Sequence, residues 1–311
     1  MSERSNAIGN TLAELSSSLL QGKREPLRLA MVALLTGGHL LIEDLPGLGK
    51  TTLALALAGS IGLSLGRIQC TSDLLPSDIT GLSIFRRDEG RFEFLAGPVF
   101  NNIVLVDEIN RAMPRTQSAL LEAMEERRVT IEGNTHLLPD PFLVIATQNP
   151  VEQTGTYPLP ESQLDRFLLC TGIGYPPAEL EKAIIAGGGV RERLEGLPRL
   201  LTATALAEAR REVAAVTLSA TVVAYLHTCV TATRHHPAVQ IGLSTRAAIG
   251  LAAAARAAAY LDGRDFVAPE DVREMAAAVG AHRLFLRPHY DTLDRRGLLR
   301  SIIDPIPLPL A

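Results

Sequence analysis

The stretch LIEDLPGLGKTTLALALA, residues 41–58, constrains the fold of this chain more than any other. It reads as a short apolar strand, a loop containing two glycines, and an apolar run with helical character. Phosphate-binding loops follow the pattern glycine, four residues, glycine, lysine, then serine or threonine, and Gly49, Lys50 and Thr51 fill its last three places. Such a loop and the helix N-terminus behind it attract anions through free backbone N–H groups. The stretch therefore predicts an α/β fold that binds a nucleotide phosphate.

Each residue of this loop has an expected role. Gly47 and Gly49 allow the backbone to approach the phosphates. Lys50 is expected to reach the β- and γ-phosphates, and the Thr51 hydroxyl to bind Mg²⁺. The other loop residues that we expect to contact the nucleotide are Pro46, Leu48 and Thr52. Lysine is rare in this chain, which has 27 arginines but only Lys23, Lys50 and Lys182.

Asp44 occupies the first place of the pattern, where a glycine is usual. A carboxylate is unexpected in a loop that holds anions. Aspartate tolerates left-handed backbone angles better than most residues do. Its side chain can also accept hydrogen bonds from nearby backbone N–H groups. We therefore expect Asp44 to modify the loop without disabling it, with its carboxylate turned away from the phosphate.

The stretch NIVLVDEINR provides a second half for the site. Its continuous apolar run is typical of a strand buried on both faces. Asp107 is expected to hold Mg²⁺, and Glu108 to orient or deprotonate the attacking water. Two adjacent carboxylates at a strand end can also form a solvated turn. Their place 57 residues after Lys50, behind an apolar strand, favours the catalytic interpretation.

Three more polar residues are candidates for the site. Asn149 ends the apolar run VIATQNP and could hold the attacking water, although Asn-Pro is also a common turn. Arg166, in PESQLDRF, could reach the site of a neighbouring subunit. Arg246, in GLSTRAA, could close a second domain onto the nucleotide. Guanidinium groups suit phosphate charge, although any single arginine forms a surface ion pair by default.

The rest of the chain indicates two domains. Alternating strands and helices predict a parallel sheet with right-handed crossovers, and polarity alternating around RDEG predicts a β-hairpin insert at about 83–97. After YPPAEL and the glycine-rich AGGGVRERLEGLP, strand-like runs vanish and alanine-rich helical segments follow. We therefore predict an α/β nucleotide-binding domain at 1–175 and an all-helical domain at 176–311.

Composition argues against several classes of protein. The chain has a net charge of −4, and residues 1–190 carry 15 basic and 22 acidic side chains. This charge argues against a nucleic-acid partner. The most apolar early run, LRLAMVALLTGGHLLIE, is too short to span a bilayer as one helix. The three cysteines have no metal-ligand or redox spacing, which indicates a reducing, cytoplasmic compartment.

The order of these motifs resembles the AAA+ ATPases, and within them the MoxR family. The segments that carry the resemblance are DLPGLGKT, TSDLLPSDITG, VDEINRAMPRTQSALLEAMEERRVTI, ATQNPVEQTGTYPLPESQLDRF and GLSTRAA. The resemblance implies a P-loop AAA+ core with a β-hairpin insert, followed by a helical lid domain. It also implies that the chain binds ATP with Mg²⁺ and hydrolyses it to ADP and phosphate. The hairpin would be the insert within helix 2 that marks the clade shared with magnesium chelatase ATPase subunits.

The resemblance also implies roles and partners. In the family's terms, the nucleotide loop is Lys50 and Thr51, the second motif is Asp107 and Glu108, the first sensor is Asn149, the trans-acting finger is Arg166 and the second sensor is Arg246. Family members form homo-oligomeric rings, usually hexamers, and work with partners that carry von Willebrand factor A domains. They are thought to mature other complexes, or to insert metals or cofactors into them, in a chaperone-like manner.

Three other functions would place different demands on the sequence. A GTPase would need an Asn-Lys-x-Asp guanine-binding motif, which the sequence lacks. A DNA-associated AAA+ motor would want a basic pore or groove, and the acidic balance of residues 1–190 argues against it. A nucleotide-dependent scaffold would not hydrolyse ATP, and the presence of Glu108 weighs against that alternative.

Overall fold

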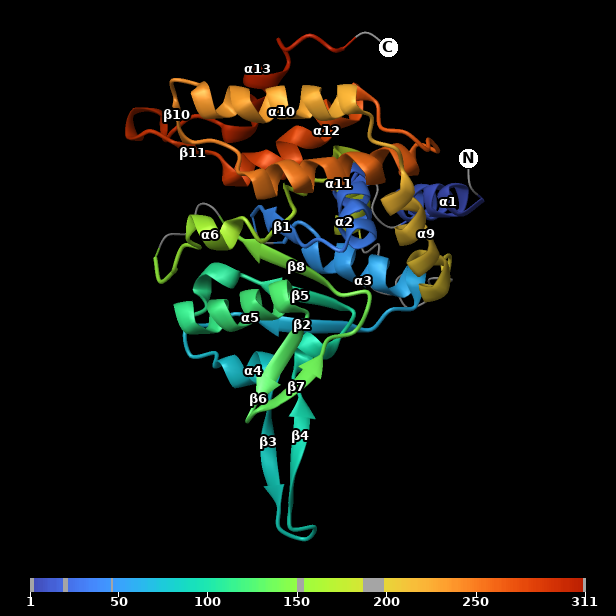
Figure 1. Cartoon of the computed structure of the whole chain (residues 1–311). Helices are drawn as coiled ribbons and strands as arrows, with labels where there is room; N and C mark the ends of the chain where they lie inside the picture. The colour runs from blue at the N-terminus through green and yellow to red at the C-terminus, as the bar shows by residue number, and fades with distance from the viewer. Residues whose placement is uncertain (1–2, 19–21, 46, 150–153, 187–198, 310–311) are drawn as a thin grey trace.

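A five-stranded parallel sheet forms the centre of the N-terminal part of the chain (Figure 1). The computed structural model describes residues 3–18, 22–45, 47–149, 154–186 and 199–309. The strand order is β2–β5–β8–β1–β9. These strands are β1 (Leu40–Glu43), β2 (Leu65–Gln69), β5 (Ile103–Asp107), β8 (Leu143–Gln148) and β9 (Leu169–Thr171). The predicted parallel sheet is therefore confirmed.

Each face of the sheet packs into its own apolar core, because successive side chains of a strand point to opposite faces. On β1, Leu40 and Ile42 join a large cluster with helices α2 (Arg24–Thr36) and α3 (Lys50–Ile61). Leu41 joins a second cluster with α5 (Pro114–Glu126) on the other face. The sheet is thus covered on both sides, and its polar residues gather where strands end.

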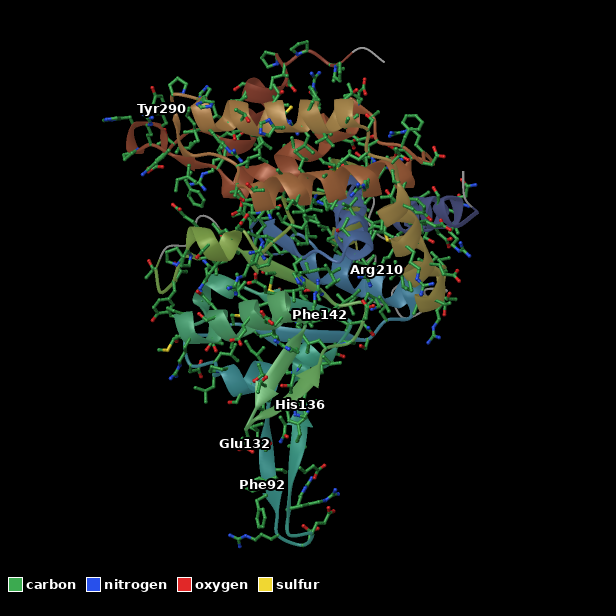
Figure 2. The ribbon with its side chains drawn as sticks, viewed as in Figure 1. Phe92, Glu132, His136, Phe142, Arg210 and Tyr290 are labelled. Atoms are coloured by element: carbon green, nitrogen blue, oxygen red, sulfur yellow. The ribbon has the colours of Figure 1, made fainter. Side chains whose placement is uncertain are left out.

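Two hairpins leave the body of this domain. Strands β3 (Gly81–Arg86) and β4 (Arg91–Ala96) pair antiparallel after the short helix α4 (Pro76–Thr80) and project far from the sheet (Figure 1). Phe92 lies near the tip (Figure 2). Its exposed ring is 5.2 Å from the exposed ring of Phe85 on the paired strand. The second hairpin pairs β6 (Arg128–Ile131) with β7 (Asn134–Leu137). The hairpin insert predicted at about 83–97 is therefore present.

Helices dominate the C-terminal part of the chain. They are α7 (Ala178–Ile185), α9 (Ala203–Ala215), α10 (Ala220–His235), α11 (Thr245–Leu261), α12 (Pro269–Gly280) and α13 (Arg295–Ile303). The prediction that this part is all-helical is wrong in one detail, because β10 (Val239–Ile241) pairs antiparallel with β11 (Phe285–Leu286). Strands of two or three residues are too short to show an alternating pattern. Most of the glycine-rich AGGGVRERLEGLP falls at 187–198, outside the described residues.

The remaining elements are short. They are α6 (Glu161–Leu164), η1 (Pro98–Phe100), η2 (Ile109–Arg111), η3 (Ala281–Arg283) and η4 (Pro288–Tyr290). Within the described ranges, no helix is both long and apolar enough to cross a membrane. The cytoplasmic location stays a prediction.

The N-terminal helices cross the predicted domain boundary. Helix α1 (Glu3–Ser18) and α2 lie beside α9 and α11 of the C-terminal part (Figure 1). Ile8 and Leu15 share one apolar cluster with Leu206 and Leu251, and the Ser5 hydroxyl donates to the carbonyl of Tyr260 at 2.6 Å. The division at residue 175 stays a prediction about organisation, while the packing joins the first helices to the lid.

His39, just before β1, is held neutral in the interior. Its Nδ1 accepts from the backbone N–H of Val144 at 3.0 Å, and its Nε2 lies 3.2 Å from the carbonyl oxygen of Met124. Burial, and then the nearby charge of Arg127, lower the pKa of His39 to about 3. The unfolded chain therefore binds a proton at this residue at pH values where the folded protein does not.

This difference predicts a loss of stability in mild acid. The folded pKa lies below the ordinary value of 6.5, so stability falls as the pH drops below that value. We expect His39 to cost the parent about 2 kcal/mol of unfolding free energy between pH 7 and pH 5. His39→Gln keeps a donor and an acceptor and should lose that component in urea titrations. His227→Gln changes an exposed histidine and should keep the parental pH dependence. Equal pH dependence in His39→Gln and the parent would contradict the prediction.

Candidate active site

A cavity of about 370 Å³ opens at the carboxyl ends of the central strands. Its lining residues are Gly47, Gly49, Lys50, Thr51, Thr52, Arg67, Gln69, Asp107, Glu108, Thr147 and Asn149. Ligands of parallel α/β sheets bind at this edge, where the loops after the strands converge. The structure thus brings the predicted glycine loop, the two carboxylates and Asn149 to one cavity. The Leu48 side chain packs against the large apolar cluster instead, and Pro46 lies outside the described residues.

The loop has the conformation that anion binding requires. Gly47 and Gly49 have φ values of 84° and 95°, in the left-handed region that other residues rarely adopt. A Cβ atom at Gly47 would meet nothing within 4 Å, so backbone conformation and not space calls for glycine there. Helix α3 begins at Lys50, and its N-cap Gly49 has no side chain to satisfy the first N–H groups. Those donors are left for an anion.

Lys50 extends from this helix N-terminus into the cavity. Its Nζ donates to the backbone carbonyl of Asp44 at 2.5 Å. Burial lowers the pKa of Lys50, while the charges of Asp44, Asp107 and Glu108 oppose that shift. An ammonium group has three donors, so Lys50 can keep the carbonyl contact and still bind phosphate oxygens.

Asp107 and Glu108 point to different partners, although they are adjacent. The Asp107 carboxylate, nearly buried, accepts from Arg67 Nε at 2.8 Å. Glu108 has a φ of 56°, uncommon for a residue with a side chain. Its N–H donates to the Thr147 hydroxyl at 3.0 Å, and its carboxylate lies 3.0 Å from Arg111 Nε. These contacts hold the two carboxylates apart, as two separate roles would require.

Arg67 and Gln69 also line the cavity, although no motif of the sequence pointed to them. Both project from β2 on its exposed side, whereas Gly66 and Ile68, which alternate with them along the strand, are buried. Gln69 pairs in register with Asp107 on β5. The alternation of apolar and polar residues in GRIQ could have indicated that Arg67 and Gln69 share one face of a strand. Their place in the cavity could not be predicted, because it depends on β2 lying next to β5 in the sheet.

The cavity contains a donor set that fits magnesium. The Thr51 hydroxyl and the Asp107 carboxylate both line it, and Mg²⁺ prefers oxygen ligands of this kind together with phosphates and water. In this structure Arg67 supplies the positive charge beside Asp107. The two residues predicted to hold Mg²⁺ are therefore compatible with it.

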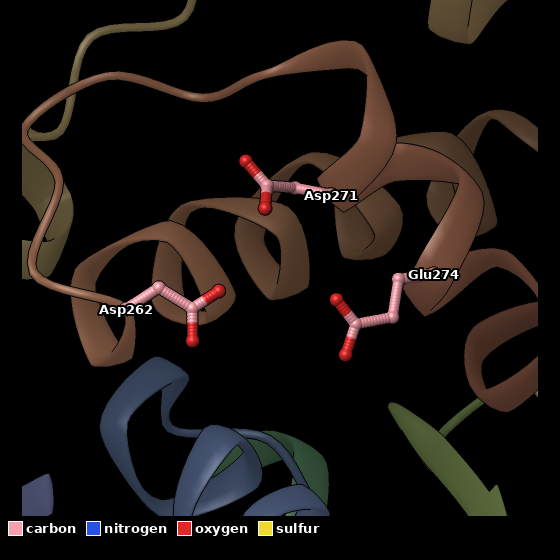
Figure 3. Close-up of side chains that lie close together, drawn as sticks. All are labelled: Asp262, Asp271 and Glu274. Carbon is pink, nitrogen blue, oxygen red and sulfur yellow. The ribbon is translucent and has the colours of Figure 1, made fainter.

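A second acidic cluster lies far along the chain, formed by Asp262, Asp271 and Glu274 (Figure 3). Both oxygens of Asp271 accept from the guanidinium of Arg264, at 2.5 and 2.6 Å. Arg28 of α2 pairs with Asp262 at 3.2 Å and with Glu274 at 3.1 Å. These arginines already balance the carboxylates, so we interpret the cluster as an ion-pair network between α2 and the lid.

The two predicted arginines lie together, but outside the cavity. Arg166 Nε is 3.1 Å from one oxygen of Glu125, and Arg246 Nη2 is 3.0 Å from the other. Glu125 belongs to the last turn of α5. Arg246 thus contacts the end of α5 and does not line the cavity, and its expected closure onto the nucleotide of its own chain stays a prediction.

Comparison with known proteins places these features in a family. Residues 39–169 match the family described as ATPase family associated with various cellular activities (AAA), and residues 231–302 match the AAA lid domain. The chain is 45% identical to the uncharacterized protein YeaC of Bacillus subtilis strain 168, over 94% of this chain and 92% of that protein. It is 42% identical to Chaperone MoxR1 of Mycobacterium tuberculosis, over 88% of this chain and 74% of that one.

Two further similarities extend over almost the whole chain. Protein MoxR of Paracoccus denitrificans is 31% identical, with 95% of this chain and 94% of that protein covered. The crystal structure of a Cytophaga hutchinsonii protein, provisionally described as an ATPase, is 37% identical and superposes with a TM-score of 0.89. That match covers 99% of this chain and 96% of the other. With a phosphate-binding loop, paired carboxylates and a helical lid in one chain, the protein belongs to the MoxR family of AAA+ ATPases.

Proposed function

We propose that this ATPase works as a homo-oligomeric ring, with six subunits as is usual in the family, and remodels or matures a protein client in a chaperone-like manner. The observation that carries the proposal is the division of the site. Lys50, Asp107 and Glu108 line one cavity, whereas Arg166 and Arg246 lie together outside it. A site divided in this way calls for a second subunit.

The residues of the cavity suit phosphoryl transfer to water. The loop N–H groups and Lys50 bind the β- and γ-phosphates. Thr51 and Asp107 would hold Mg²⁺, which offsets phosphate charge when bound. Glu108 accepts a proton from the water whose oxygen attacks the γ-phosphorus, and the bond from that phosphorus to the bridging oxygen breaks, releasing ADP. Asn149 lines the same cavity and would orient that water, while the Thr147 hydroxyl accepts from the backbone of Glu108.

The arginines would complete the site from the neighbouring subunit. Within the described residues, Arg67 is the arginine that lines the cavity, and it is paired with Asp107. Arg166 and Arg246 share Glu125, so one patch presents two guanidinium groups. We propose that both act on a neighbour's γ-phosphate, which moves Arg246 from the intrachain role expected from the sequence. An arginine supplied in this way is worth on the order of 10³–10⁵ in rate.

The client role rests on similarity. One relative is described as a chaperone, and the family resemblance adds a von Willebrand factor A-domain partner and the insertion of metals or cofactors. Addition of such a partner should change the ATPase rate, whereas added DNA should not. Stimulation by DNA alone would favour the alternative of a DNA-associated motor.

Lys50→Ala should abolish nucleotide binding or lower turnover at least about 100-fold, because it removes the cation that faces the phosphates. Phosphate release and binding of a fluorescent ATP analogue measure the two effects. Lys182→Ala changes an exposed lysine of α7 and should behave as the parent does. Parental turnover in Lys50→Ala would reject the assignment of the loop.

Mixing variants tests the divided site. Glu108→Gln should bind ATP without turning it over, and Arg166→Ala should bind ATP and hydrolyse it poorly. In mixed rings, an intact Glu108 of one chain meets an intact Arg166 of its neighbour, so some activity should return. Absence of recovery in assemblies shown to contain both chains, or full activity in dilute monomer, would refute the shared site.

The same design decides how Arg246 acts. If Arg246 serves a neighbour, mixed rings of Arg246→Ala and Glu108→Gln should regain activity. If it serves its own nucleotide, every site with an intact Glu108 lacks Arg246, and activity stays low. We expect recovery, because Arg246 contacts the same carboxylate as Arg166.

A further inference from the structure

The Asp44 carboxylate does more than cap its own turn. One oxygen accepts from the N–H of Leu45 at 2.8 Å, as expected. The other accepts from the N–H groups of Ile173 and Gly174, at 2.7 and 2.6 Å. Burial alone would raise the pKa of Asp44, but these three donors and the charge of Lys50 leave it below its ordinary value. The carboxylate is thus an acceptor shared between two distant segments.

Backbone conformation does not explain the aspartate. Among the described residues other than glycine, positive φ values occur at Glu108, Arg127 and Glu132. Asp44 is described and has no such value, so its tolerance of left-handed angles is unused. The interaction of its side chain therefore accounts for the residue better than the geometry of the turn does.

Lys23 holds the same segment from its other side. This lysine precedes α2 and is buried. Its Nζ donates to the carbonyl of Ile173 at 3.0 Å and to the carbonyl of Gly174. Burial lowers the pKa of Lys23, and the charge of Asp44 opposes that shift. We call Asp44, Lys23 and the backbone of Ile173 and Gly174 the clamp.

The clamped segment is the start of the connection to the lid. It follows β9 and precedes α7, whose first residue is Ala178. Parts of this connection pack closely against Asp44 and against the residues that precede α2. A Cβ atom at Gly172 would lie 3.3 Å from the Asp44 carboxylate, and one at Gly22 would lie 2.7 Å from Pro177. Movement of residues 172–177 would therefore displace Asp44 or the residues around Gly22.

The opposite end of Asp44 touches the nucleotide loop. Its carbonyl oxygen accepts from Lys50 Nζ, the group that faces the phosphates. A single residue thus contacts Lys50 through its backbone and the lid connection through its side chain. Few rotatable bonds separate the two contacts, so displacement at one end is passed to the other.

From these contacts we propose that Asp44 and Lys23 are positioning residues that couple nucleotide binding at Lys50 to the connection between the two domains. The proposal rests on the ATP site described above. Neither residue needs to touch the reacting atoms. The backbone carbonyl of Asp44 orients Lys50. Lys23 holds the backbone of Ile173 and Gly174 in the position where it also binds the Asp44 carboxylate.

Two variants and a matched control test the coupling. Asp44→Asn keeps the size but exchanges an acceptor oxygen for a donor, so at least one backbone N–H loses its partner. Lys23→Met removes the ammonium and keeps much of the chain's bulk. We expect each to raise the KM for ATP about tenfold, with kcat within about twofold of the parent. Lys182→Met, at an exposed lysine, should leave both constants unchanged.

Hydrogen exchange separates coupling from plain destabilisation. In the parent, a non-hydrolysable ATP analogue with Mg²⁺ should slow exchange in a peptide covering 172–178. In both variants that peptide should exchange about tenfold faster without nucleotide, and the analogue should no longer slow it. Peptides of β5 and β8 should stay protected, which a general loss of stability would not allow.

Each outcome decides the proposal. The proposal would be overturned if both variants had the parental KM for ATP. It would also be overturned if the ATP analogue did not change the rate of hydrogen exchange at 172–178 in the parent. If Asp44→Asn does not fold, the KM and the exchange of Lys23→Met test the proposal, because Lys23 does not line the cavity. If neither variant folds, the effect of the ATP analogue on exchange at 172–178 in the parent tests it. A parent that does not hydrolyse ATP would instead count against the ATPase assignment and not against the clamp.

Discussion

Burial of the parallel sheet on both faces leaves only its edges for polar chemistry. The side chains of β5 and β8 are buried almost throughout, and alternate residues feed two apolar clusters. Unsatisfied polar groups are costly in such an interior, so the catalytic groups collect where parallel strands end together. The glycine loop, Asp107 and Asn149 come from separate parts of the chain, yet this geometry delivers them to one cavity.

Arg166, which precedes β9, and Arg246 of the lid both lie away from that cavity. Helices α1 and α2 tie the lid to the face of the sheet opposite α5. Arg246, at the start of α11, nevertheless pairs with Glu125 at the end of α5, as Arg166 does. A carboxylate between two guanidinium groups holds them close despite their like charge. Such a patch fits the role proposed for both arginines at the γ-phosphate of a neighbouring subunit.

Asp44 contacts both Lys50 of the nucleotide loop and the connection to the lid. In a loop that binds anions, a carboxylate would be repulsive if it faced the ligand. Here it faces the backbone N–H groups of Ile173 and Gly174, and Lys23 takes the neighbouring carbonyls. The departure from the usual glycine thus serves the boundary between domains. A nucleotide loop and an interdomain connection that share one residue cannot move independently.

Local patterns in the sequence were enough to predict the parallel sheet, the hairpin insert and the helical C-terminal part. They also pointed to the glycine loop, Asp107, Glu108 and Asn149, which the structure brings to one cavity. Each depends on neighbours in the chain: the glycines before Lys50, the apolar run before Asp107, the alternation around RDEG. The β10–β11 pair, the place of Arg67, the shared Glu125 and the partners of Asp44 could not be predicted. These features join residues tens to more than a hundred positions apart, and only the packing of the sheet, helices and lid decides which side chains meet.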